Sequence, residues 1–295
     1  MRNVTVAATQ MSCIWDREAN ITKAENLVRE AAGKGANIIL LQELFEMPYF
    51  CHAADPEYFS IARPFEGNPM IEEMKALAKE LNVVLPVCFY EDCGIVKFNT
   101  IAVIDADGTV LGRYRKTHIP EDVNYYEKYY FAHGDTGFKV WDTKFGKIGI
   151  GICWDQWFVE TARILALNGA ELIFYPTAIG QYAVDDIKDL DKAENHIDHW
   201  RNTMLGHAAA NMIPVVVSNR TGVEQEPKKK SYMRFQGQSF ISDNIGNVVT
   251  SMDRDSEGVI TATFDLDELA RYRDGFGIFR DRRPEMYGDL LKLVR

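Results

Sequence analysis

The sequence predicts an α/β protein built as a four-layer αββα sandwich. Short apolar runs rich in β-branched residues alternate along the chain with amphipathic helical stretches, which is the order of an α/β fold. In addition, the segments AAGKGANIILLQELF and LALNGAELIFYPTAI both read as a helix end, Gly-Ala, an apolar run and a polar or proline stop. They indicate duplicated α-β-β units, which pack as two sheets between helical layers.

The first half of the chain is expected to contain two helices and five strands. The strand VTVAATQM precedes a helix over about residues 19–34 and the apolar strand ANIILLQEL. A second helix over about residues 69–81 precedes the strand VVLPVCFY. Asp-Ala-Asp-Gly then joins two strands in IAVIDADGTVLGRYRK, because Asp and Gly tolerate the positive φ angles of a hairpin turn. A polar, aromatic loop over about residues 118–137 follows.

The second half repeats this alternation. The strand GKIGIGIC runs into the helix WFVETARILALNGA, and the strand ELIFYPTA precedes a long helix over about residues 190–211 and the strand IPVVVSN. A hairpin, GQSFISDNIGNVVTSM, the strand GVITATFDL and a polar tail complete the chain. Because no segment reads as a linker, residues 1–295 are predicted to form one domain.

The composition opposes nucleic-acid and membrane partners and favours a small-molecule substrate. The formal net charge is -10, which opposes binding to nucleic acids and to anionic membranes. The N-terminal segment MRNVTVAATQMS has no signal-peptide pattern, and no apolar run is long enough to cross a membrane. The five cysteines lack C-x-x-C spacing, so they are expected to be reduced thiols in a cytoplasmic protein.

Cys153 is the first candidate for chemistry, because it ends a glycine-rich strand and directly precedes a helical pattern. The free N–H groups and the positive dipole end of a helix stabilise a thiolate, which is the nucleophilic form of cysteine. The alternative is a buried structural cysteine, a description that fits Cys88 well. The position at a strand-to-helix junction favours a nucleophile for Cys153.

Glu43 and Lys116 are charged candidates for the same site. Glu43 follows a run too apolar for a solvated strand, so its carboxyl is expected at the carboxyl end of a buried strand, where ligands bind in α/β sheets. There it can act as general base and then general acid, whereas the alternative is a capping or salt-bridged glutamate. Lys116 alone reads as a surface cation. Beside Glu43 and Cys153 it would stabilise an oxyanion, helped by the N–H of Trp154.

The other motifs indicate no second chemistry. His196 and His199 lack the H-E-x-x-H pattern, so the sequence predicts no metal site. The chain has no G-x-G-x-x-G, no P-loop and no G-x-S-x-G elbow. A cysteine enzyme with His118 or His133 as its base is the alternative that the histidines leave open.

Three segments resemble a known family. LLQELF, YRKTHIP and GICWDQWF, in this order and with this spacing, resemble the signature segments of the nitrilase superfamily of carbon–nitrogen hydrolases, and they supply Glu43, Lys116 and Cys153. The resemblance continues through LIFYPTAIG, GHAAANMIPVVVSNR and RDRRPEMY, so it covers nearly the whole chain. It implies an αββα sandwich, a reaction without metal or cofactor, and assembly as a homodimer or higher homo-oligomer.

The resemblance also implies a mechanism. The family glutamate deprotonates the cysteine, the sulfur attacks a carbonyl or nitrile carbon, and water activated by the same glutamate hydrolyses the acyl-enzyme. Glu127, in YYEKYYF, matches a second family glutamate that would orient the lysine or the substrate. Trp154, Asn124, Tyr49 and Ala178 belong to loops expected to surround the nucleophile, so they are predicted to bind substrate.

Within the superfamily, ICWDQWF, FYPTAIG and DHWRNTMLGHAAAN resemble the amidases that hydrolyse N-carbamoylputrescine to putrescine, carbon dioxide and ammonia in polyamine synthesis. Enzymes for N-carbamoyl-D-amino acids place arginines shortly after the nucleophile, whereas this chain has Gln156 and Trp157. A putrescine derivative carries an ammonium that an unpaired cation would repel, so the difference fits this substrate. The candidates for the ammonium are acidic loop residues: Glu121, Asp122, Asp185 and Asp186.

Two other functions stay open. Another amidase of the superfamily, such as a β-ureidopropionase-like enzyme, would use the same three residues. A catalytically idle binding protein with the nitrilase fold would have no need for all three. The loop IPEDVNYY also lacks the glycine-containing turn that is more usual before the second glutamate in the N-carbamoylputrescine amidases, and this change would alter the shape of the pocket.

Overall fold

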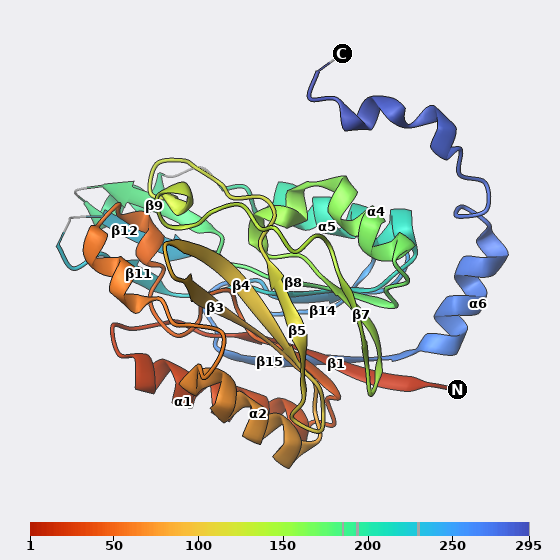
Figure 1. Cartoon of the computed structure of the whole chain (residues 1–295), viewed down its shortest axis with the longest axis horizontal. Coiled ribbons are helices and arrows are strands. Elements are labelled where there is room, and N and C mark those ends of the chain that lie inside the picture. Colours follow the sequence, from red (N-terminus) through yellow and green to blue (C-terminus); the bar gives the residue numbers. More distant parts are fainter. Residues whose placement is uncertain (185, 193–194, 229–230, 295) are drawn as a thin grey trace.

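The computed structural model describes residues 1–184, 186–192, 195–228 and 231–294. Two β-sheets face each other at its centre, with helices on both outer faces (Figure 1). A parallel bridge between Ile38 and Val84 joins the two halves of the first sheet. Its strands, in spatial order, are β15 (Gly258–Asp265), β1 (Asn3–Gln10), β2 (Ile38–Leu40), β3 (Leu85–Cys93), β4 (Val96–Ile104) and β5 (Val110–Arg115).

The second sheet has six strands, and the predicted αββα sandwich is confirmed by its position against the first. In spatial order they are β14 (Val248–Ser251), β13 (Phe240–Ser242), β10 (Val215–Ser218), β8 (Leu172–Pro176), β7 (Gly146–Ile150) and β6 (Val140–Thr143). The sequence did not predict a third, three-stranded sheet: β11 (Val223–Gln225), β12 (Ser231–Phe235) and β9 (Gly180–Val184).

Alternation along the strands builds three apolar layers. In β1, Val6 and Ala8 point into the core between the two sheets, and Ala7 points toward the helices, because successive side chains of a strand face opposite ways. The helices α1 (Arg17–Gly33) and α2 (Pro69–Leu81) cover the first sheet. The helices α4 (Val159–Leu167) and α5 (Ile197–Asn211) cover the second sheet.

Local signals set the ends of α2 where the sequence predicted them. The side chain of Asn68 accepts a hydrogen bond from the N–H of Met70, Pro69 occupies the first turn, and Asn82 ends the helix in the left-handed conformation. The β4–β5 hairpin around Asp-Ala-Asp-Gly is also confirmed. Within the described ranges, no helix is both long and apolar enough to cross a membrane.

Two sequence predictions about where helices begin are wrong, and one helical region was missed. The helix expected directly after Cys153 begins as the short 3-10 helix η3 (Cys153–Trp157), and α4 starts only at Val159, because Phe158 adopts an extended conformation between them. The long helix expected from about residue 190 starts at Ile197 and follows η4 (Ile187–Asp191). The polar tail, for which the sequence analysis named no helix, contains α6 (Leu266–Phe276), η5 (Pro284–Met286) and η6 (Gly288–Leu291).

The strand ends bring the loops of both sheets together. The hydroxyl of Ser218, at the end of β10, donates to the carbonyl of Leu40 at 2.9 Å and accepts from the N–H of Thr9 at 3.0 Å. Since Leu40 ends β2 in the other sheet, this buried contact ties the two sheets at one edge. The loops that follow β2, β8 and β10 therefore start from neighbouring points.

Candidate active site

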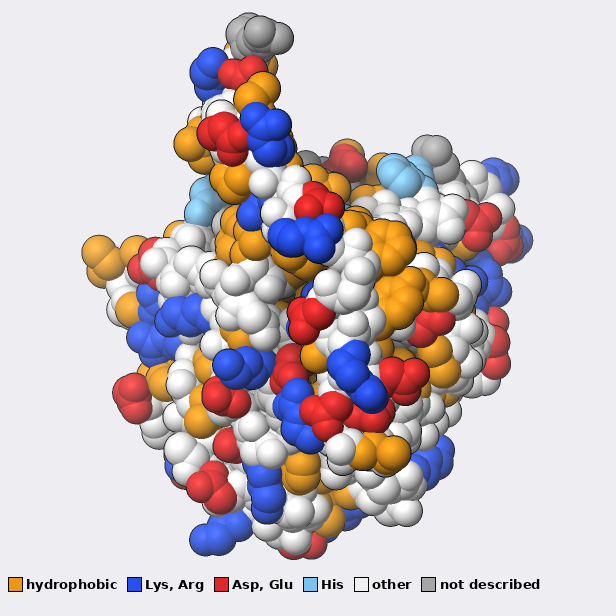
Figure 2. All heavy atoms as spheres, turned by 90° about the vertical axis from the view of Figure 1, so that its right-hand side faces the viewer, with side chains coloured by type: hydrophobic (Ala, Val, Ile, Leu, Met, Phe, Trp, Pro, Cys, Tyr) orange, Lys and Arg blue, Asp and Glu red, His pale blue; other side chains and the backbone are white. Residues whose placement is uncertain are grey.

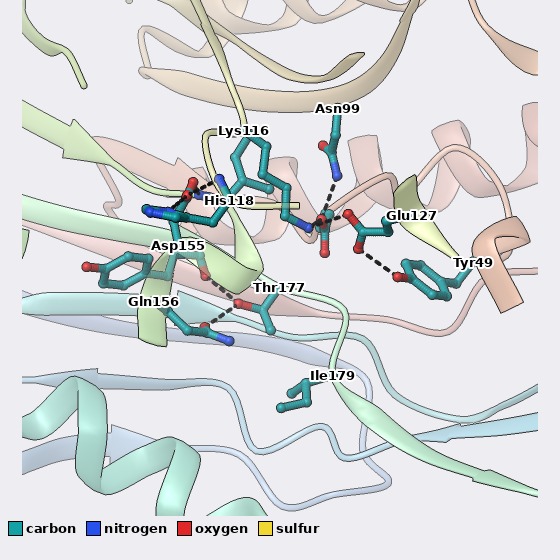
Figure 3. A network of polar contacts seen from close by, with 12 residues as sticks. Tyr49, Asn99, Lys116, His118, Glu127, Asp155, Gln156, Thr177 and Ile179 are labelled. Carbon is teal, nitrogen blue, oxygen red and sulfur yellow. Dashed lines mark hydrogen bonds and ion pairs between the residues drawn. The ribbon is translucent and has the colours of Figure 1, made fainter. Parts of the chain in front are cut away.

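A fully buried charge cluster lies at this edge. The ammonium of Lys116, directly after β5, donates to Glu43 Oε1 at 2.8 Å and to Glu127 Oε2 at 2.6 Å, and all three side chains are 0% exposed (Figure 3). Glu43 lies in the loop after β2, and Glu127 begins the short helix α3 (Glu127–Tyr130). The structure thus brings together three of the four predicted catalytic residues through direct contacts.

Two neighbours fix the carboxylates. Asn99, on β4, donates its Nδ2–H to Glu43 Oε1 at 2.7 Å, and the hydroxyl of Tyr49 donates to Glu127 Oε1 at 2.7 Å (Figure 3). Both oxygens of Glu127 are therefore bonded. Glu43 Oε2 is buried and has no hydrogen-bond partner within the described part of the chain. We call Glu43, Asn99, Lys116 and Glu127 the Lys116 cluster.

Electrostatics in the Lys116 cluster keep the lysine charged and raise the pKa of Glu127. Burial lowers the pKa of Lys116, but Glu127 and Glu43 outweigh it, so that its pKa lies well above the usual value and the ammonium stays charged. Burial and the neighbouring Glu43 raise the pKa of Glu127 to about 7, although Lys116 opposes this shift. Two carboxylates thus share one cation.

Cys153 lies beside this cluster, in the turn after β7, as the first residue of η3. It has φ +44°, a left-handed conformation that side chains other than glycine rarely adopt, and it is 7% exposed. The N–H of Ala178 donates to its sulfur. Burial, followed by the charge of Glu43, raises the pKa of the Cys153 thiol well above its usual value. The prediction of a thiolate stabilised by a helix end is therefore wrong: desolvation outweighs the N–H groups of a helix that is only 3-10 here.

Asp155 holds the turn of the nucleophile, a role that no sequence pattern indicated. Its Oδ2 accepts from the N–H of Ile152 at 2.9 Å and from the hydroxyl of Tyr114 at 2.7 Å. Its Oδ1 accepts from the N–H of His118 at 3.0 Å and lies 2.7 Å from the ring Nδ1 (Figure 3). Asp155 therefore connects the Cys153 turn to the strand end that carries Lys116.

The two histidines considered as bases have other contacts. His118 contacts Asp155, and its ring stacks on Phe158 with centroids 3.6 Å apart. His133 Nδ1 lies 3.2 Å from the carbonyl of Thr117. In the described ranges no cluster of three or more His, Cys, Asp or Glu side chains could hold a metal ion. Glu43 Oε2, in contrast, has no partner among the described residues.

The predicted substrate-binding residues have different environments. Asn124 is 4% exposed, adopts φ +60°, and its buried Nδ2 has no partner among the described residues. Its left-handed conformation replaces the glycine turn missing from IPEDVNYY. Ala178 is buried against the sulfur, and Tyr49 is engaged with Glu127. Trp154 is 39% exposed, with its ring 6.1 Å from that of Trp157. Direct contact of these side chains with substrate stays a prediction.

The described acidic residues that were considered as partners of the substrate ammonium accept hydrogen bonds from backbone N–H groups. Glu121 accepts from the N–H of Lys128, and Asp186 caps η4 by accepting from the N–H of Lys188. Asp122 accepts from the N–H of Val123. Asp185 lies outside the described residues. None of these contacts identifies a partner for a substrate ammonium.

The chain belongs to the carbon–nitrogen hydrolase family, because the sequence model of that family matches residues 5–274. It is an amidohydrolase. The resemblance seen in the signature segments is thereby confirmed.

Individual relatives narrow the class further. The chain is 53% identical to an N-carbamoylputrescine amidase of Solanum lycopersicum, over 99% of this chain and 96% of the relative. It is 45% identical to a citrullinase of Francisella tularensis, over 99% of both chains. Among solved structures, a carbon–nitrogen hydrolase from Helicobacter pylori superposes with a TM-score of 0.91 at 35% identity, covering 99% of this chain and 100% of that one.

Proposed function

We propose that this protein hydrolyses N-carbamoylputrescine to putrescine, carbon dioxide and ammonia in polyamine synthesis, with Glu43, Lys116 and Cys153 as catalytic residues. The observation that supports this most is Glu43 Oε2, which is buried beside Lys116 and has no partner among the residues that the structure describes. The chain is also 53% identical to an N-carbamoylputrescine amidase. Glu127 is proposed to orient Lys116, since it bonds the ammonium while Tyr49 holds its other oxygen.

The first step follows from the state of the thiol. Because the pKa of Cys153 is raised, the sulfur carries its proton at rest and needs a base as it attacks. Glu43 Oε2 is proposed to take this proton while the sulfur forms a bond to the ureido carbon. Asn99 and Lys116 hold Oε1, so the free oxygen stays oriented throughout.

The second step forms a negatively charged tetrahedral intermediate and then breaks it down. An ammonium has three N–H donors, and Lys116 uses two of them on carboxylates. The third, with the N–H of Trp154, is proposed to bond the oxygen that becomes negative in the tetrahedral intermediate. Glu43 returns its proton to the nitrogen that leaves, as ammonia or as putrescine. Water, deprotonated by Glu43, then cleaves the carbon–sulfur bond, and the second amine and carbon dioxide are released.

The F. tularensis relative makes citrulline hydrolysis the second candidate. Citrulline has the same ureido group and an amino group at the same separation, with a carboxylate added. Lys116 and Arg220, the buried cations at the site, already bond carboxylates or backbone carbonyls. A substrate carboxylate would therefore have to compete for them, which supports the substrate without one.

Ammonia release tests the proposal. We expect turnover of N-carbamoylputrescine by the purified protein and none by its Cys153→Ala variant. Citrulline, N-carbamoyl-β-alanine and glutamine serve as parallel substrates. Cys153-dependent turnover of citrulline or N-carbamoyl-β-alanine instead would overturn the substrate and keep the mechanism. No Cys153-dependent turnover of any substrate would indicate an idle binding protein.

We also propose a homodimer or higher homo-oligomer in the cytoplasm, with residues 1–295 acting as one domain. After α6 the chain leaves the body and projects from it (Figure 1), and Figure 2 shows hydrophobic side chains along this projection and at its base. Leu291 and Leu293 are 92% and 100% exposed there. Such apolar surface favours contact with another copy. All five cysteines are free thiols, which supports a reducing compartment.

Light scattering on size-exclusion fractions tests the assembly. We expect the full chain to elute as an oligomer and a chain ending after Phe276 to elute with a smaller mass. An unchanged mass after truncation would exclude the projecting segment as the contact.

A further inference from the structure

The loop after β2 carries two residues of the site and has little regular structure of its own. It contains Glu43 and Tyr49, and Leu44 adopts φ +50° between them. The carbonyls of such a loop need hydrogen-bond partners, because buried backbone groups without partners are costly. The partners come from a distant part of the chain, the segment after β10.

One buried arginine binds three of these carbonyls. Arg220 is 0% exposed, its Nε donates to the carbonyl of Glu43 at 3.1 Å, and its Nη2 donates to the carbonyl of Met47 at 2.8 Å and to that of Leu44. Its Nη1 donates to Glu224 Oε1 at 2.7 Å. The planar fork of a guanidinium thus holds the backbone at the carbonyl of Glu43 and directly after it.

Glu224 completes the contact from the other end of the loop. Its Oε2 accepts from the N–H of Tyr49 at 2.5 Å, and Tyr49 in turn bonds Glu127. The Arg220–Glu224 pair therefore fixes the base at one end of the loop and the partner of the second glutamate at the other. We call this pair the loop clamp.

We propose that the loop clamp positions Glu43 for proton transfer, with Arg220 acting through the backbone of the base. This inference rests on the proposed function of Glu43 and Cys153. Arg220 bonds the main chain of Glu43, so it is a positioning residue, and it takes no proton from the substrate. A buried ion pair is weak as a device for stability, since apolar side chains of the same volume often stabilise as well.

Precision of placement explains the use of arginine. Catalytic groups must be held within about 0.5 Å of the productive geometry, and an error of about 1 Å costs about 10²-fold in rate. Lysine in place of Arg220 keeps the charge but replaces a planar fork by a single nitrogen, so it cannot hold all three carbonyls and Glu224. We expect Arg220→Lys to lower kcat about 10- to 100-fold with a smaller change in KM.

A double-mutant cycle on the alkylation of Cys153 by iodoacetamide tests the proposal, with the modified peptide measured by mass spectrometry. The four proteins are wild type, Arg220→Lys, Glu43→Gln and the double variant. We expect Arg220→Lys to slow alkylation about tenfold or more in wild type and hardly at all when Glu43 is already Gln. Equal slowing in both backgrounds would show a general structural role and overturn the proposal.

Two further variants keep the result interpretable. Arg115→Lys changes another buried arginine bonded to a glutamate, and we expect it to lower thermal stability without slowing alkylation of Cys153. If Arg220→Lys does not fold, Glu224→Gln weakens the same clamp and must show the same dependence on Glu43. An unchanged rate in Glu43→Gln would overturn the proposed function itself, whereas an unchanged rate in Arg220→Lys alone would overturn only the loop clamp.

Discussion

Two buried charge clusters lie side by side on β4 and β5 and contain similar residues. In the Lys116 cluster, β4 supplies Asn99, β5 is followed by Lys116, and Glu43 and Glu127 are the acids. One residue later on β4, at Thr100, and one residue earlier at the end of β5, at Arg115, a second cluster begins. Its members are Glu91, Thr100, Arg115 and Asp135. We call it the Arg115 cluster.

The two clusters differ in how completely their carboxylate oxygens are paired. Arg115 bonds both oxygens of Glu91, at 2.8 Å and 2.7 Å, and it lies over the ring of Phe98. Its other acid, Asp135, is 63% exposed and solvated. The Lys116 cluster instead buries two carboxylates against one cation and leaves Glu43 Oε2 without a partner among the described residues. The charges of the Arg115 cluster are paired or solvated, so this cluster stabilises the fold. The Lys116 cluster has one more carboxylate than cations, so it can accept a proton.

The sharpest way to break this comparison is to remove each cation in turn. We expect Lys116→Met to lower kcat/KM about 10³-fold, because it removes the donor proposed for the oxyanion. We expect Arg115→Met to leave kcat/KM nearly unchanged and to lower the free energy of unfolding by up to about 3–5 kcal/mol, because buried Glu91 loses both hydrogen bonds from Arg115 and keeps only Arg113, at 3.2 Å, as a cationic partner. Ammonia release and urea denaturation measure the two effects. A large loss of activity in Arg115→Met would show that the clusters are not separate.

The acids give the next contrast. We expect Glu127→Gln to lower kcat about 10- to 100-fold, because a neutral amide holds the ammonium of Lys116 less firmly in place. Glu91→Gln should affect stability and leave kcat alone. The same two assays apply to both variants. Equal activity of Glu127→Gln and wild type would leave the family glutamate with no part in the reaction.

Substitutions of the neutral hydrogen-bond donors on β4, Asn99 and Thr100, should have smaller effects than those of the charged residues. We expect Asn99→Ser to lower kcat/KM about tenfold, because the hydrogen bond to Glu43 Oε1 is lost. Thr100→Val removes the corresponding bond to Glu91, so it should cost about 1–3 kcal/mol of stability and little activity. The comparison would fail if Thr100→Val were the less active of the two.

The smallest effect is a dependence of stability on pH. The pKa of Glu127 is raised from 4.5 to about 7, so between these values the folded chain holds a proton that the unfolded chain has released. Its contribution to stability is therefore present below about pH 4.5 and is lost as the pH rises through about 7. Urea denaturation across this window should show a decline of no more than about 3 kcal/mol from this group, which is absent in Glu127→Gln. Identical pH profiles of the two proteins would contradict it.

Local signals made much of the fold predictable. The Asn68 cap and Pro69 set the start of α2, and the Asp-Ala-Asp-Gly turn set the β4–β5 hairpin, because each acts between near neighbours in the chain. The sheet of β9, β11 and β12 has no such signal. Its strands are short, and β9 pairs with β12 across about fifty residues of sequence, as Gln181 and Arg234 show.

The site was predictable only in part. The signature segments predicted Glu43, Lys116 and Cys153, and Glu127 followed only from the family resemblance. Asn99 and Asp155 were missed because each acts through partners far along the chain, and neither residue type carries a local pattern for that role. The thiolate prediction failed for a related reason: a strand-to-helix pattern contains no information about how deeply the sulfur is buried.

The left-handed backbone at Cys153 has an evolutionary consequence. At φ +44°, glycine has less backbone strain than any L-residue. A population selected only for expression and folding should therefore drift to glycine at this position. A library randomised at position 153 and sorted on soluble yield should be enriched in glycine, whereas the same library sorted on ammonia release should return cysteine. The difference between the two sorted pools measures how strongly selection for the reaction opposes selection for the fold.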